Sequence, residues 1–218
     1  MASLALAEAI SRMGVVPVIA IGDEAGALAL GDALIEGGLP IAEITFRTKA
    51  AAKVIQALSR ERPAILVGAG TVLTAADLKA AKDAGAGFAF APGLNPDIVK
   101  QAQDLGIVFI PGIATPSELE QALSLGCAIV KFFPAESLGG LEMLSAMSAP
   151  YRHTGIKVIP TGGVKHANLE AYLNHPLVLG VGGSWIATTE EIAAGQWQAI
   201  TAKCQDAAAA VRRIRPLA

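Results

Sequence analysis

Eight short apolar segments recur along the chain, and their starts are separated by 20 to 28 residues. None of these segments alternates polar and apolar positions, and each ends in glycine, proline or a small polar residue. Such segments are typical of parallel strands that are covered on both faces. We therefore predict eight buried parallel strands. They are VVPVIAI from Val15, IAEITF from Ile41, ILVGAG from Ile65, FAFAPG from Phe88, VFIPGIA from Val108, IVKFFPA from Ile129, KVIPTGG from Lys157 and VLGVGGS from Val178.

Stretches with helical periodicity separate the apolar segments. Thr74, Asn95 and Thr115 precede three of these stretches as N-cap residues, and a glycine ends each of the three. Eight alternating strand and helix units favour a single (β/α)8 TIM barrel, an α/β fold, over an open doubly wound sheet, which usually has fewer strands. In such barrels the reactive groups gather at the carboxyl ends of the strands.

The composition is that of one compact domain. The chain has 218 residues, 53% apolar and 17% charged, with a formal net charge of −2. We expect a single barrel domain over residues 1–218, with an extra amphipathic N-terminal helix at about 3–13 and the barrel at about 15–210. No apolar run is long enough to span a membrane, and no basic run precedes the three arginines near the C-terminus. Neither a membrane nor nucleic acid is therefore an expected partner.

The cysteines and histidines form no recognisable metal or disulfide pattern. Cys127 and Cys204 lie far apart, which favours reduced thiols and a cytoplasmic protein. The three histidines lack the HxxxH spacing of zinc ligands. The GAGT segment from Gly68 lacks the third glycine of a dinucleotide loop. We expect no metal and no cofactor.

Two charged residues interrupt the apolar segments. Lys131 is the one lysine of nine that lies inside such a run, and Glu43 has the same position in the second predicted strand. Burial favours the neutral amine, which is the nucleophile of imine chemistry. If both side chains face the barrel mouth, they form a nucleophile and a general base. The alternative is an internal ion pair that fills the barrel.

Further candidate groups follow the predicted strands. Arg47 offers a planar fork for a substrate carboxylate, or is a solvated loop arginine. Thr71 and Pro92 end the third and fourth strands. The last two strands end in glycine-rich segments whose amides can approach an anion, so we expect a phosphate-bearing substrate; tight turns are the alternative. The phosphate-binding candidates are Thr161, Gly162, Gly163, Gly183 and Ser184.

The assembled motifs resemble the family of 2-keto-3-deoxy-6-phosphogluconate (KDPG) and 4-hydroxy-2-oxoglutarate (KHG) aldolases. The motifs are VVPVIAI, EITFRT, VGAGTVL, APG, IPGIAT, KFFPAE, PTGG and GGSW, between about Val15 and Trp197. The resemblance implies a class I aldolase that cleaves KDPG to pyruvate and glyceraldehyde 3-phosphate. It implies that Lys131 forms the imine and that Glu43 is the general acid and base.

The same resemblance implies roles for other residues and an assembly state. Arg47 and Thr71 would hold the pyruvoyl carboxylate, Pro92 and Phe133 would shape the pocket, and Gly162, Gly163 and Ser184 would contact the phosphate. Members of this family are typically homotrimers, and some also cleave KHG. The Arg47-Thr48 pair favours the gluconate substrate over its galactonate isomer. The competing hypotheses are a phosphogalactonate aldolase, a sugar-phosphate isomerase or epimerase that forms no imine, and a sensor that releases no pyruvate.

Overall fold

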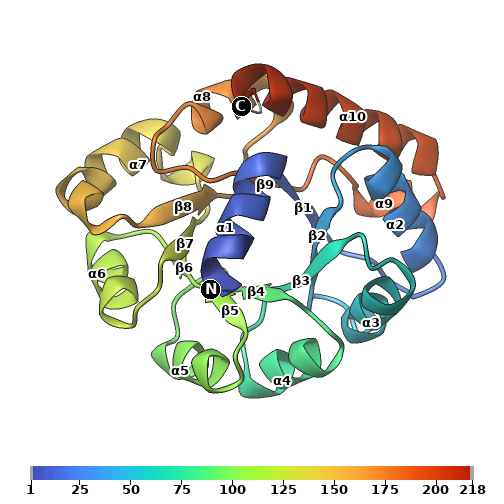
Figure 1. Ribbon diagram of the computed structural model, residues 1–218, viewed down its shortest axis with the longest axis horizontal. Coiled ribbons are helices and arrows are strands. Elements are labelled where there is room, and N and C mark those ends of the chain that lie inside the picture. The colour runs from blue at the N-terminus through green and yellow to red at the C-terminus, as the bar shows by residue number, and fades with distance from the viewer. Residues whose placement is uncertain (1, 217–218) are drawn as a thin grey trace.

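The computed structural model describes residues 2–216 and shows strands that alternate with helices (Figure 1). The strands are β1 Val15–Ile19, β2 Ile41–Thr45, β3 Leu66–Gly70, β4 Phe88–Phe90, β5 Val108–Ile110, β6 Gly112–Ile113, β7 Ile129–Phe132, β8 Lys157–Pro160 and β9 Val181–Gly183. The helices are α1 Ala2–Met13, α2 Ala27–Glu36, α3 Ala51–Glu61, α4 Ala75–Asp83, α5 Pro96–Asp104, α6 Pro116–Ser124, α7 Gly140–Ser148, α8 Leu169–Leu173, α9 Thr189–Ala193 and α10 Trp197–Ile214. Short 3-10 helices cover Glu136–Leu138, Ala149–Thr154 and His166–Asn168.

The three predicted helix starts are confirmed by their caps. The side chains of Thr74 and Thr115 each accept a hydrogen bond from the backbone of the third helical residue, in a capping box. Asn95 accepts one from the amide of Asp97, and Pro96 occupies the first turn of α5. These caps satisfy amides that the helix itself leaves unpaired, so the start of each helix is set locally.

The strands form two parallel sheets, and the prediction of one closed eight-stranded TIM barrel is wrong. The larger sheet has the order β5-β4-β3-β2-β1-β9, and the smaller has the order β6-β7-β8. The predicted fifth strand is divided at Pro111: β5 pairs with β4, whereas β6 pairs with β7. Proline has no N–H to donate, which interrupts a ladder. At the other junction, between β8 and β9, residues 2–216 form two isolated bridges, Val158 with Val178 and Thr161 with Gly182, and no continuous ladder.

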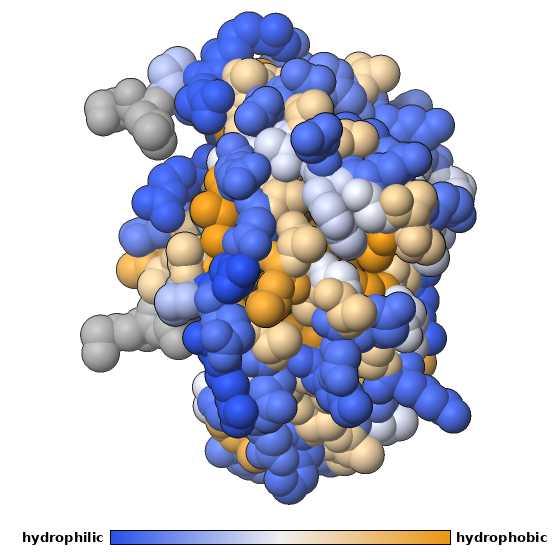
Figure 2. All heavy atoms as spheres, turned by 90° about the vertical axis from the view of Figure 1, so that its right-hand side faces the viewer, coloured by the Kyte–Doolittle hydropathy of each residue, from blue (hydrophilic) through white to orange (hydrophobic). Residues whose placement is uncertain are grey.

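Both sheets nevertheless surround a common interior. Figure 1 shows their strands around one centre, with helices α2 to α10 outside them. Figure 2 shows the flank formed by α2, α3, α9 and α10, where hydrophilic residues alternate with small apolar patches. Apolar side chains fill both the space between the strands and these helices and the interior that the strands enclose, where the Phe88 and Phe90 rings meet edge to face at 5.5 Å.

Helix α1 covers the end of the strand assembly where the strands begin. It lies across the middle of the ring in Figure 1, and it buries Leu6, Ile10 and Met13. A cavity lined by α1 residues also includes Ala128 and Lys157, which lie at the starts of β7 and β8. The carboxyl ends of the strands therefore face the opposite side of the molecule, away from α1.

Cys127 and Cys204 are free and buried, as the sequence predicts. Burial raises the pKa of the Cys127 thiol to about 11 and that of Cys204 to about 12. Both thiols therefore remain protonated at neutral pH and pack as small apolar groups. Among residues 2–216, no helix is both long and apolar enough to cross a membrane.

Candidate active site

Lys131 and Glu43 meet in the interior between the two sheets. Lys131 lies on β7 in the smaller sheet, and Glu43 lies on β2 in the larger one. The Lys131 Nζ lies 3.1 Å from Glu43 Oε1 and 3.4 Å from Oε2. Only 5% of Lys131 and 1% of Glu43 are exposed. The two charges that interrupt the apolar segments are thus one buried, hydrogen-bonded pair.

Aromatic rings and a glycine shape the space around this pair. The Lys131 ammonium lies 5.1 Å from the centroid of the Phe90 ring and 5.7 Å from that of Phe133. A Cβ at Gly70 would lie 2.3 Å from Glu43 Oε1, so only glycine leaves room for the carboxylate there. The Lys131 side chain therefore lies between two aromatic rings and the Glu43 carboxylate.

Arg47 is held by a hydroxyl on the same strand face as Glu43. Thr45 is buried, and its Oγ1 donates a hydrogen bond to the Ile19 carbonyl at 3.0 Å and accepts one from Arg47 Nε at 3.2 Å. Residues two apart on a strand point to the same side, so Thr45 lies on the side of Glu43. The guanidinium, which belongs to an exposed residue, is thereby fixed at the rim of the interior.

Replacing Thr45 by valine is expected to raise the KM for a substrate whose carboxylate binds Arg47 by about threefold to tenfold, because one hydrogen bond that orients Arg47 is lost. Steady-state kinetics would measure the change. Thr48→Val is the matched control, since the Thr48 hydroxyl is buried and has no hydrogen-bond partner within residues 2–216. Equal KM values in the two variants would show that Thr45 does not position Arg47.

A cavity of about 300 Å³ opens above the pair at the carboxyl ends of the strands. It brings together nine of the eleven site residues that the sequence predicts, including Arg47 and Ser184. Thr71 also lines the cavity and has a φ of +56°, a left-handed backbone that a β-branched residue rarely adopts. The complete lining is Val18, Glu43, Thr45, Arg47, Thr71, Pro92, Lys131, Phe133, Thr161, Gly162 and Ser184.

Replacing Thr71 by glycine is expected to stabilise the fold by about 1 kcal/mol and to impair the site, because it removes both the backbone strain and the hydroxyl. Urea unfolding would measure the free energy of unfolding, and steady-state kinetics would measure the change in KM that reports on the site. Thr71→Ala is the control: it loses the hydroxyl but keeps the unfavourable φ, so it should gain no stability. A glycine variant no more stable than the alanine variant would contradict backbone strain at this position.

The glycine-rich segments after β8 and β9 lie on one side of this cavity. Gly162 and Ser184 line it, whereas Gly163 and Gly183 do not. The amides of Gly162, Gly163 and Ser184 donate to no acceptor in the described part of the chain. A Cβ at Gly183 would lie 2.6 Å from the Trp185 ring, so packing against this ring accounts for a glycine at residue 183. Free amides at a loop of this kind can bind an anion.

The sequence pattern of the family described as "KDPG and KHG aldolase" matches residues 6–203. The chain belongs to this family. It is 46% identical over 198 residues to the 2-dehydro-3-deoxy-phosphogluconate aldolase of Treponema pallidum, which covers 91% of this chain and 93% of that protein. It is 40% identical over 202 residues to the KHG/KDPG aldolase of Escherichia coli K12, covering 92% and 94%.

A solved structure of the same family is also similar to this aldolase. The KDPG aldolase of Legionella pneumophila superposes with a TM-score of 0.87 at 40% identity, over 91% of this chain and 96% of that one. That crystal structure holds pyruvate captured as a covalent carbinolamine intermediate.

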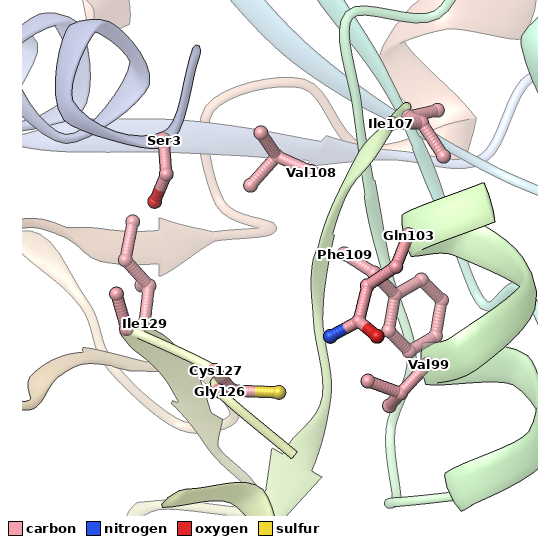
Figure 3. A pocket seen from close by; sticks show the side chains of 10 residues that line it. Ser3, Val99, Gln103, Ile107, Val108, Phe109, Gly126, Cys127 and Ile129 are labelled. Atoms are coloured by element: carbon pink, nitrogen blue, oxygen red, sulfur yellow. The ribbon is translucent and has the colours of Figure 1, made fainter. Parts of the chain in front are cut away.

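Two further cavities lie near the amino ends of the strands, away from the Lys131–Glu43 pair. The cavity of about 170 Å³ in Figure 3 lies near the starts of β5 and β7 and is lined mainly by apolar side chains, with Gln103 and the protonated Cys127 thiol. The cavity of about 660 Å³ beneath α1 includes Lys157, whose Nζ donates to the Pro176 carbonyl. No group of three or more potential metal-ligating side chains occurs in residues 2–216.

Two lining residues of the site were missed by the sequence analysis. Thr45 could have been found, because it lies two residues from Glu43 and so on the same face of a strand. Val18 could not, since it is one apolar residue in an apolar run. Gly163 and Gly183, which were also predicted as anion contacts, do not line the cavity, but the Gly163 amide follows that of the lining residue Gly162 and stays a candidate contact.

Proposed function

We propose that this aldolase, a carbon–carbon lyase, cleaves KDPG to pyruvate and glyceraldehyde 3-phosphate through an imine on Lys131. The observation that carries this proposal is the buried Lys131 Nζ, 3.1 Å from Glu43 Oε1, beneath a cavity at the carboxyl ends of the strands. A nucleophile and a proton-transfer group within hydrogen-bond reach are the pairing that imine chemistry requires.

Lys131 acts first. Its neutral amine attacks the C2 ketone to form a carbinolamine, and loss of water gives a protonated imine. Glu43 moves the two protons of this step: it takes one from the Lys131 ammonium to free the amine and a second from the nitrogen after attack, and it delivers both to the former ketone oxygen, which leaves as water. The cationic imine then attracts electrons from the neighbouring C3–C4 bond.

Glu43 then serves the cleavage. It removes the proton of the C4 hydroxyl, the C3–C4 bond breaks, and its electron pair enters the imine as an enamine of pyruvate. C4 becomes the aldehyde of glyceraldehyde 3-phosphate. Protonation of the enamine at C3 and addition of water release pyruvate and the free Lys131 amine.

The remaining lining residues bind the two ends of the substrate. Arg47 and Thr71 hold the carboxylate of the pyruvoyl half, and Pro92 and Phe133 enclose it. At the other end the free amides of Gly162 and Gly163 and the Ser184 hydroxyl receive the phosphate, as supported by their lack of protein acceptors in residues 2–216. Thr161 contributes a buried wall between the two ends.

Trapping with sodium borohydride tests the imine directly. After incubation with pyruvate and borohydride, we expect intact mass to increase by one reduced pyruvyl group and peptide mapping to place the group on Lys131. Lys157, the other lysine on a strand, is the internal control, because it lies at the amino end of β8. A folded protein without any adduct would overturn the proposal and favour an isomerase, an epimerase or a sensor.

We propose KHG as a second substrate, because it shares the pyruvoyl half that Lys131 and Arg47 engage. The E. coli relative whose name includes KHG supports this. The shorter KHG has no phosphate and cannot reach the glycine-rich segments in the same way. The two substrates therefore separate the roles of the two ends of the cavity.

Ser184→Ala is expected to raise the KM for KDPG by about threefold to tenfold and to leave KHG cleavage unchanged, since one phosphate hydrogen bond is lost. Coupling pyruvate release to a lactate dehydrogenase assay would measure both substrates. Ser137→Ala is the control, because Ser137 is exposed and lies outside the cavity. Equal effects of Ser184→Ala on both substrates would place the phosphate elsewhere.

We propose further that the enzyme is a cytoplasmic homotrimer with a small-molecule substrate and no nucleic-acid or membrane partner. The resemblance to the family supports the trimer, and the net charge of −2 supports the absence of nucleic acid. Sedimentation velocity would test the trimer: a monomer at micromolar concentration would contradict it.

A further inference from the structure

Glu136 lies directly beneath the glycine-rich segment after β8. Its backbone amide donates to the Gly162 carbonyl at 3.0 Å. Gly163 has a φ of +82°, and a Cβ there would lie 2.6 Å from Glu136 Cβ and 2.7 Å from Cγ. The methylene groups of Glu136 therefore occupy the space that a side chain at residue 163 would need. The glycine-rich segment therefore contacts Glu136 in two ways: through a backbone hydrogen bond and through the methylene groups of the Glu136 side chain.

Tyr172 fixes the carboxylate of Glu136. The Tyr172 hydroxyl donates to Glu136 Oε1, and only 1% of Tyr172 is exposed. Burial, together with this neighbouring carboxylate, raises the pKa of Tyr172, so the hydroxyl keeps its proton. Gly140 leaves room for the pair, since a Cβ there would lie 3.0 Å from Glu136 Oε1 and 3.3 Å from the Tyr172 hydroxyl.

The pair turns the carboxylate away from the substrate. Glu136 is absent from the lining of the cavity, whereas Gly162 lines it. A carboxylate beside a phosphate would repel it, so a direct contact is unfavourable. Its bond to a buried hydroxyl on α8 instead holds Glu136 against the Gly162–Gly163 segment. Amides that are already in place when a ligand arrives lower the cost of binding.

We propose that Glu136, held by Tyr172, is a positioning residue that prepares the Gly162–Gly163 amides for the phosphorylated end of the substrate. The inference rests on the proposed function and deepens it. Because Glu136 acts through the glycine-rich segment, its role concerns the affinity for the phosphate and not the chemistry at Lys131.

Four variants test the inference. Tyr172→Phe and Glu136→Ala are expected to raise the KM for KDPG by about tenfold, because each breaks a hydrogen bond to a charged group. Both should leave kcat, KHG cleavage and the pyruvate adduct on Lys131 unchanged. Glu136→Gln keeps an acceptor oxygen and should restore a KM close to that of the unmodified enzyme. Tyr151→Phe is the control, since Tyr151 also donates to a glutamate, Glu120, but on a remote exposed surface.

Inhibition by glycerol 3-phosphate adds a readout of phosphate affinity that does not depend on the KM. Its inhibition constant against KHG cleavage should rise about tenfold in Tyr172→Phe and Glu136→Ala. An equal loss of activity on KDPG and KHG would overturn the inference, and so would an unchanged KM and inhibition constant in both variants. Thermal unfolding would show whether each variant folds. If the inference about Glu136 fails but the proposed function holds, the unmodified protein still forms the pyruvate adduct on Lys131. If the proposed function fails, no adduct forms.

Discussion

Replacing Lys131 by methionine is expected to abolish the pyruvate adduct and to reduce KDPG cleavage by roughly 10⁵-fold or more, since no imine forms without its amine. Methionine keeps much of the apolar volume among Phe90 and Phe133. Intact mass after borohydride treatment and pyruvate release would measure the two effects. Cleavage within about tenfold of the unmodified enzyme would contradict an essential nucleophile.

The same substitution is expected to destabilise the protein, and a second substitution separates stability from chemistry. Methionine leaves the Glu43 carboxylate buried without its partner, which costs about 3–5 kcal/mol. Lys131→Met combined with Glu43→Gln removes both charges and should recover most of that loss in urea unfolding. Activity should not recover. A double variant as unstable as the single one would show that the ion pair is not the source of the loss.

Replacing Glu43 by glutamine is expected to slow proton transfer by roughly 10²-fold or more while Lys131 still forms some imine. The amide keeps the shape of the side chain but cannot exchange a proton. Loss of the pyruvate methyl protons into deuterated water, followed by NMR, reports enamine formation directly. The borohydride adduct should persist in this variant, which separates the general base from the nucleophile.

Glu43→Asp is the matched control for this variant. It keeps a titratable carboxyl but withdraws it by one methylene from the Lys131 Nζ, so its exchange rate should lie between those of the unmodified enzyme and Glu43→Gln. If Glu43→Gln exchanges the pyruvate methyl protons as fast as the unmodified enzyme, Glu43 is only an ion-pair partner of Lys131 and not the general base. The chemistry would then require another base in the cavity.

The glycine-rich end of the cavity shows why tight turns and anion contacts are hard to separate in a sequence. Gly162 has a free amide and lines the cavity, whereas Gly183 is explained by the Trp185 ring. Both occur in similar glycine-rich segments after apolar runs. Glycine marks a place where something approaches the backbone closely, and only the neighbours show whether that is a ligand or a side chain.

The sequence by itself determined the strand and helix alternation, the helix caps and the choice of Lys131 and Glu43 as the candidate catalytic pair. These features depend on residues close together in the chain, or on a charge where only apolar residues are otherwise found, as at Lys131 and Glu43. The side-chain period of a strand also places Thr45 and Glu43 on one face.

Only the tertiary structure decided how the strands pair and which groups meet. The division at Pro111 depends on hydrogen bonds with β4 and β7, strands that lie on opposite sides of it in the chain. The contact of Glu136 with Tyr172 joins residues 36 apart, and that of Lys131 with Glu43 joins residues 88 apart. Such contacts arise from the packing of the sheets and helices, because local propensity contains no information about what lies across the interior.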